Sequence, residues 1–239
     1  MSGKYILDLH THTIASGHAY NTINEMIRAA KEKGLALLGI AEHGPGMLGG
    51  ADKFYFQNLH ILEREKYGIQ VRYGAELNII ELDGTVDLEE RSLQDLDYCI
   101  ASLHYNCMTP GTEKENTFAL LTAMEHPKVS IIGHPDDGHF PVNYEELIRE
   151  AKRQQVYIEL NNSSFNPKGF RNNAWENNIQ ILKMCMKFEE PIILGSDAHR
   201  EEDVGQFSDA QKILDFVEFP ESLILNGSAE SMKIRNLFG

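Results

Sequence analysis

Cysteine is scarce in this sequence. Only three are present, Cys99, Cys107 and Cys185, and no two of them form a CxxC pair. An odd number with this spacing excludes a disulfide framework and a thiolate zinc knuckle. The stretch before His10 is too short and mixed for the apolar part of a signal peptide, and no segment approaches about 18 consecutive apolar residues. We therefore expect a cytoplasmic protein without a membrane anchor.

Positive charge is also in short supply. The chain has 22 Lys and Arg against 36 Asp and Glu, a formal net charge of −14. This balance repels phosphate backbones and anionic membranes, so we expect neither extended nucleic acid nor a membrane as partner. With 239 residues and 42% hydrophobic residues the composition is that of a globular protein, and α/β barrels of this length often form one domain. A single domain over residues 1–239 is the expectation.

Apolar runs rich in β-branched residues recur along the chain and alternate with helical patterns. The predicted strands are Tyr5–Leu9, Leu35–Ala41, Ile69–Ala75, Tyr98–Leu103, Val129–Gly133, Val156–Leu160 and Pro191–Gly195. The predicted helices, besides one that follows Thr22, are Lys53–Tyr67, Leu88–Leu96, Lys114–Met124, Leu147–Gln154, Asn177–Phe188, Gln206–Val217 and Ala229–Leu237. Alternation of this kind predicts a parallel sheet, and strands apolar almost throughout indicate that both faces are covered.

Several residues have the character of helix ends. Thr22 and Glu25 form a capping-box pattern, Asn143 with Glu146 repeats this opening, and Gly34 stands where a helix would end. The regular series of units favours an α/β fold that is a closed or nearly closed barrel. An open doubly wound sheet is the alternative, but no glycine-rich dinucleotide fingerprint follows the first strand.

Histidines and carboxylates follow six of the seven predicted strands. In a barrel the carboxyl ends of parallel strands meet at one face, so side chains distant in sequence converge there. Imidazoles with carboxylates and no thiolate suit zinc, manganese or iron. At three or four ligands each, the set is large enough for two or three ions. The candidate metal ligands, one of them in the loop after the first strand, are His10, His12, His18, His43, Glu76, His104, His134, Asp197 and His199.

Three further residues are candidates for supporting roles. Arg200, next to His199, and His139, in a loop on the same face, are the candidate substrate-binding residues. Asp8 precedes His10 by two positions, and it is either an acceptor for a ligand imidazole or a carboxylate facing water.

Six short motifs in one order resemble the polymerase and histidinol phosphatase (PHP) superfamily, most closely its stand-alone trinuclear-zinc phosphatases. His18 matches as well, whereas Glu42 stands where an Asp is common in the family. The motifs are Asp8-Leu-His-Thr-His12, Ala41-Glu-His43, Gly74-Ala-Glu76, Ser102-Leu-His104, Gly133-His-Pro135 and Gly195-Ser-Asp-Ala-His199.

The resemblance implies a distorted (β/α)7 TIM-like barrel with three divalent ions, zinc being expected and manganese or iron possible, and it permits a homotrimer. It also implies how the ligands are shared. The first ion would take His10, His12, Glu76 and Asp197, the second His18, His43 and His199, and the third His104 and His134 with Glu76 bridging.

The expected reaction is hydrolysis of a small phosphate monoester, with a metal-bridging hydroxide as nucleophile and no protein nucleophile. Two alternatives remain. The same metals could hydrolyse a phosphodiester, as an exonuclease does, or the chain could be a metal-binding or polymerase-associated interaction module without turnover.

Overall fold

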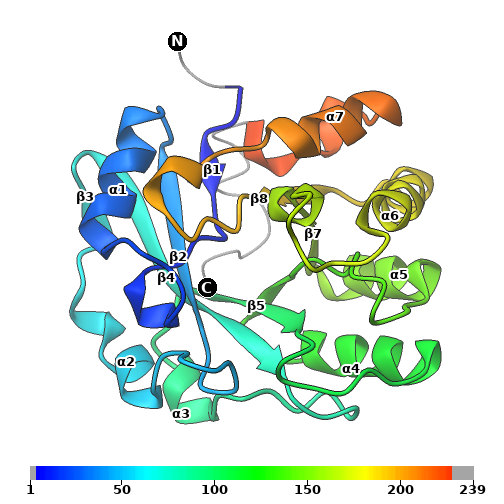
Figure 1. The fold of residues 1–239 in the computed structure, drawn as a ribbon, viewed down its shortest axis with the longest axis horizontal. Helices are drawn as coiled ribbons and strands as arrows, with labels where there is room; N and C mark the ends of the chain where they lie inside the picture. The colour runs from blue at the N-terminus through cyan, green and yellow to red at the C-terminus, as the bar shows by residue number, and fades with distance from the viewer. Residues whose placement is uncertain (1–3, 228–239) are drawn as a thin grey trace.

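A mostly parallel sheet forms the centre of the molecule in the computed structural model, which describes residues 4–227 (Figure 1). The strands are β1 (Leu7–Asp8), β2 (Leu37–His43), β3 (Glu65–Lys66), β4 (Ile69–Ile79), β5 (Tyr98–Leu103), β6 (Val129–Ile132), β7 (Tyr157–Asn161) and β8 (Ile192–Gly195). They pair in the order β1-β2-β4-β5-β6-β7-β8, all in parallel, and β3 adds to β4 as the antiparallel exception. Every predicted strand is therefore present, although β1 is shorter than expected.

The first and last strands approach each other and nearly close the sheet into a barrel. Beyond β1 and β8, Thr11 and Ala198 form a parallel bridge, and the Asp197 amide donates to the His10 carbonyl at 2.8 Å. Nearer the amino ends, Asn226 fills the gap, because its side chain accepts from the Leu194 amide at 2.7 Å and donates to the Leu7 carbonyl at 3.0 Å. The prediction of an α/β, TIM-like barrel is confirmed over the open doubly wound alternative.

An apolar cluster fills the inside of the barrel. Glycine at position 39 is needed there, because a methyl group on it would overlap the Tyr98 hydroxyl. This cluster lies between the strands themselves. The polar residues that follow the strands therefore gather beyond it, at the carboxyl end of the barrel. Its members are Leu7, Leu9, Leu37, Ala41, Tyr98, Ile100, Ile131, Tyr157, Ile193 and Leu225.

Seven α-helices surround the sheet in the part of the chain that the structure describes, and a second, larger apolar cluster lies between the two layers (Figure 1). The capping box of Thr22 with Glu25, the Asn143 cap and the left-handed Gly34 (φ 81°) are all confirmed. The helices are α1 (Ile23–Glu32), α2 (Lys53–Gln57), α3 (Glu90–Leu93), α4 (Glu113–Met124), α5 (Tyr144–Gln154), α6 (Ala174–Phe188) and α7 (Ser208–Phe216).

One predicted helix, Lys53–Tyr67, is wrong. The segment contains only α2 and a short 3-10 turn before β3 turns back into β4. The two residues of that hairpin turn, Tyr67 and Gly68, have φ values of 54° and 80°, which suit the tight twisted turns of antiparallel hairpins. The predicted helix Leu88–Leu96 shrinks to the four residues of α3, and Ala229–Leu237 lies outside the described residues. Within residues 4–227 no helix has the length and hydropathy needed to cross a membrane.

Candidate metal centre

The candidate ligands converge because of strand order and register. His43 ends β2 and pairs in register with Glu76 of β4. The sequence predicted that Glu76 stands at the end of its strand. β4 continues to Ile79, however, so Glu76 lies inside the strand. The remaining ligands follow the carboxyl ends of β1, β5, β6 and β8, and all nine are brought to one end of the barrel.

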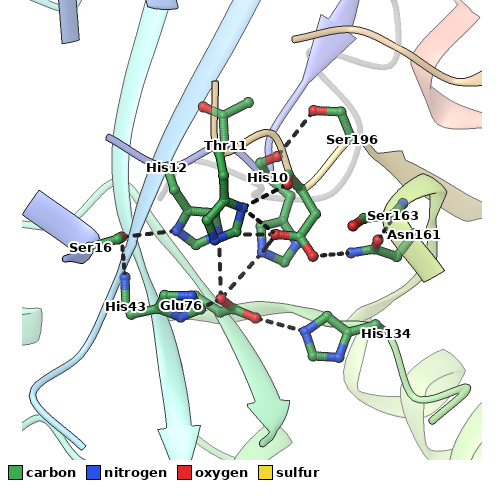
Figure 2. Close-up of polar contacts among 12 residues, drawn as sticks. His10, Thr11, His12, Ser16, His43, Glu76, His134, Asn161, Ser163 and Ser196 are labelled. Carbon is green, nitrogen blue, oxygen red and sulfur yellow. Dashed lines mark hydrogen bonds and ion pairs between the residues drawn. The ribbon is translucent and has the colours of Figure 1, made fainter. Parts of the chain in front are cut away.

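The Glu76 carboxylate is the centre of the cluster, and Figure 2 shows imidazole rings around it. Its Oε2 lies 2.8 Å from His43 Nδ1, 3.4 Å from His10 Nε2 and 3.5 Å from His12 Nε2. Its Oε1 lies 2.9 Å from His134 Nε2 and 3.2 Å from His104 Nε2. One fully buried carboxylate thus faces five imidazoles.

Asp197 provides a second carboxylate on the same cluster. Its Oδ1 lies 3.3 Å from His12 Nε2, 3.7 Å from His10 Nε2 and 3.5 Å from His199 Nδ1. The His199 ring continues the cluster outward, because its Nε2 lies 2.9 Å from His18 Nε2. The loop residue His18 therefore joins the strand-end ligands.

The charges of the cluster are mutually dependent. Burial alone would raise the pKa of Glu76, but the facing imidazoles of His104, His10 and His43 lower it well below its usual range. The pKa of Asp197 is lowered well below its usual range in the same way, against burial, by His10, His12 and Arg171 among others. For His12, burial lowers the pKa well below the usual value, and neighbouring imidazoles add to the effect. Ionised carboxylates beside a neutral imidazole are the forms that bind divalent cations.

Two of the candidate ligands have unusual backbone conformations. His134 has φ 28° and Asp197 has φ 55°, a region in which non-glycine side chains are strained. Such strain persists only where the surrounding structure enforces it, and it concentrates at functional sites. Here it lets the chain turn inward directly after β6 and β8.

A further layer of polar residues orients the imidazoles. Glu159 Oε1 accepts from His10 Nδ1 at 2.7 Å, and Asn78 Oδ1 accepts from His104 Nδ1 at 2.7 Å. The Ser16 hydroxyl contacts His12 Nδ1 at 3.0 Å and donates to Glu42 at 2.6 Å. Hydrogen bonds of this kind fix which ring nitrogen faces the ligand site.

Asp8 does not have the role that its spacing suggested. It is fully buried, which excludes a water-facing carboxylate. Its oxygens accept from the Ser196 hydroxyl at 2.5 Å and the Gly205 amide at 2.8 Å, and more weakly from the His10 amide at 3.4 Å. Asp8 therefore fixes backbone near the site, and Glu159 is the carboxylate that accepts from the His10 ring.

The nitrogen and oxygen atoms that face the centre of the cluster fit divalent metal ions. His10 Nε2, His12 Nε2, His43 Nδ1 and Glu76 Oε2 are buried and face one another, but none of them makes a contact with hydrogen-bond geometry in the part of the chain that the structure describes. Buried polar atoms without partners are costly, and a shared cation would satisfy all four. Three groups have donor atoms within 4.8 Å of one another: His10, His12 and Glu76; His12, His43 and His199; and His43, Glu76 and His104.

The two predicted substrate contacts lie at different places. His139 lines a cavity beside His104, with its ring held by Asp137 at 2.7 Å. The Arg200 guanidinium is largely exposed and donates to Asp203 at 2.6 and 3.1 Å.

Arg171, which no sequence motif indicated, is a buried cation that pairs with a carboxylate of the cluster. Its side chain is 8% exposed, and it donates to Asp197 Oδ2 at 3.0 Å, to Asn161 Oδ1 at 3.1 Å and to Ser164 Oγ at 3.0 Å. It lies in the loop after β7, and no motif spacing marks it.

Comparison with known proteins agrees with this site. The PHP domain model matches residues 8–163. A probable phosphatase of Clostridium novyi is 47% identical over 93% of this chain and 91% of its own length, and one of Caldicellulosiruptor saccharolyticus is 44% identical over 94% and 93%. The fold is similar, at a TM-score of 0.61 and 18% identity, to that of histidinol phosphate phosphatase from Lactococcus lactis, solved with zinc, L-histidinol and phosphate; the match covers 90% of this chain and 95% of that one.

The chain belongs to the PHP domain family, as its motifs predicted. Within that family it is a phosphatase, a hydrolase, like the relatives that resemble it over nearly their whole length. The predicted family, fold and enzyme class are confirmed together.

Proposed function

We propose that the protein is a metal-dependent phosphatase that hydrolyses a small phosphate monoester at a site for three divalent ions, with zinc expected. His10, His12, Glu76 and Asp197 would hold the first ion. His18, His43 and His199 would hold the second, and His104 and His134, with Glu76 bridging, the third. The observation that carries this proposal is that four buried atoms able to coordinate a metal, three imidazole nitrogens and one carboxylate oxygen, face one another without hydrogen bonds.

The protein's own residues prepare the site for these ions. Because Glu159 accepts the Nδ1 proton of His10, the Nε2 lone pair of that ring points toward Glu76 and Asp197. Asn78 orders the His104 ring in the same way. When bound, divalent ions lower the pKa of a coordinated water and neutralise phosphoryl oxygens. No protein nucleophile is then needed.

A small substrate fits the surroundings of the cluster. A cavity of about 580 Å³ adjoins it, within the range typical of small-molecule sites. Its charged lining besides the metal ligands consists of Lys168 and Arg171 against Asp203, and Arg171 already pairs with Asp197. This near balance suits one phosphate and not a polyanion, which supports the expectation of no extended nucleic acid. A cytoplasmic location and a homotrimer stay predictions.

The test begins with metal-free protein. After chelation, hydrolysis of p-nitrophenyl phosphate and of a panel of monoesters, including L-histidinol phosphate, should be lost and should return with zinc or manganese. Elemental analysis should find more than one ion per chain. Full activity of metal-free protein would refute the proposal. Faster turnover of bis-p-nitrophenyl phosphate would favour the phosphodiesterase alternative, and metal binding without turnover of either ester would favour the interaction module.

A further inference from the structure

A second cavity, of about 410 Å³, opens beside the metal centre. It shares Met47, His104, Asn106 and Phe170 with the larger cavity described above. His104 belongs to the cluster through its 3.2 Å contact with Glu76, so it forms a common wall. A molecule whose phosphate lies at the metal centre can therefore extend its organic part past His104 into this second cavity.

The lining of this cavity is aromatic and uncharged, apart from histidine. Besides the four shared residues it contains Tyr105 and His139, and among the described residues that line it none carries a carboxylate, an ammonium or a guanidinium. Tyr105 is 60% exposed and Phe170 is 68% exposed. Two large exposed rings at one cavity are typical of a binding surface. Aromatic rings and a Met thioether pack favourably against another aromatic ring.

His139 gives the cavity one fixed polar group. Asp137 is nearly fully buried, and its Oδ1 accepts from His139 Nδ1 at 2.7 Å, from the His139 amide at 3.1 Å and from the Asn172 amide at 3.1 Å. All three donate to one Asp137 oxygen, which fixes the orientation of the His139 ring and places a proton on its Nδ1 atom. The second nitrogen of this ring is Nε2. The ring also packs against Tyr105, and the two ring centroids are 5.5 Å apart.

We propose, on the basis of the phosphatase function above, that this cavity receives the organic part of the substrate and that this part is an uncharged aromatic alcohol. Burying a ring between Phe170 and Tyr105 removes apolar surface from water on both sides. A charged amine or a polyol would instead be desolvated in this cavity with few partners for its polar groups.

The inference is tested with alkyl phosphates whose leaving groups have similar acidity. For the zinc-loaded parent, kcat/KM for benzyl phosphate should exceed that for ethyl phosphate, glycerol 1-phosphate and phosphoethanolamine by about tenfold or more. Phe170→Ala should remove most of this preference, because it should lower kcat/KM for benzyl phosphate several-fold more than kcat/KM for ethyl phosphate. Phe118→Ala is the matched control, because Phe118 is another exposed ring, on α4, that does not line the cavity.

Binding provides a second measurement. Calorimetry should show that Phe170→Ala weakens the binding of benzylphosphonate about tenfold more than the binding of ethylphosphonate. A parent that prefers glycerol 1-phosphate or phosphoethanolamine, or a variant that loses both alkyl esters equally, would overturn the inference while the phosphatase function stands. If no ester is hydrolysed, the proposed function fails, and the phosphonate comparison still decides whether the cavity selects an aromatic ring.

Discussion

Replacing Glu159 with glutamine should weaken metal binding without unfolding the protein. The carboxylate makes three bonds: Oε1 accepts from His10 Nδ1 at 2.7 Å, and Oε2 accepts from the His134 amide at 2.9 Å and from Asn161 Nδ2 at 3.0 Å. An amide has only one oxygen. In either orientation its NH2 group faces a hydrogen-bond donor, so at least one of these three contacts is lost.

The size of the effect follows from this geometry. Glu159 is 1% exposed, and its charge helps to raise the pKa of His10 well above the usual value, against the effect of burial. Glutamine removes that charge and makes the His10 ring a poorer ligand. Loss of such an outer partner typically costs about 10- to 100-fold in metal affinity, or roughly 1.4–2.7 kcal/mol.

Competition with a chromophoric chelator measures the zinc affinity of the parent and of Glu159→Gln directly. Glu145→Gln on α5 is the control, because that carboxylate is at the surface and pairs with Arg149 and Lys187. Thermal unfolding of the metal-free variant, if close to that of the parent, assigns the loss to the site and not to the fold. Parental zinc affinity in Glu159→Gln would refute the assignment of this carboxylate as the residue that orients His10.

Three further changes test other parts of the structure. Gly195→Ala should destabilise the protein and impair metal binding together, measured by urea unfolding and zinc titration, because a methyl group there would overlap Glu159. Tyr98→Phe should lower the free energy of unfolding by about 1–3 kcal/mol, since the Leu9 carbonyl inside the barrel would lose the hydroxyl that donates to it. Burial raises the pKa of Asp136 from 3.8 to about 6, partly offset by a nearby guanidinium, so its contribution to stability is present below about pH 4 and is lost as the pH rises through about 6. Over that interval Asp136→Asn should therefore gain stability relative to the parent, by roughly 3 kcal/mol at most. Denaturation curves from pH 4 to 8 measure this gain, and a constant stability difference across the range would contradict the prediction.

The convergence of the candidate ligands could be predicted because their positions obey a rule of the fold. His43, His104 and Asp197 lie at the carboxyl ends of different strands, and parallel strands present these ends at one face of a barrel. The sequence alone contains that regularity. The break in the Lys53–Tyr67 helix could not be read in the same way. The apolar spacing there is compatible with a helix, and it is the antiparallel pairing of β3 with β4 that shows that the chain reverses at Tyr67 and Gly68.

Glu159 and Arg171 were missed for a different reason, since each acts through a partner distant in the chain. Glu159 contacts His10 across the barrel, and Arg171 contacts Asp197. The sequence nevertheless contained a clue to Glu159. It lies in the middle of the apolar run Val156–Leu160, and a carboxylate in a strand covered on both faces must have a partner, because an unpaired buried charge costs several kcal/mol. In a barrel whose neighbouring strands end in histidines, an imidazole is the natural partner. Arg171 offers no such clue, because a loop arginine is ordinarily exposed, and only the packing of Asn161 and Ser164 around it explains why it is buried.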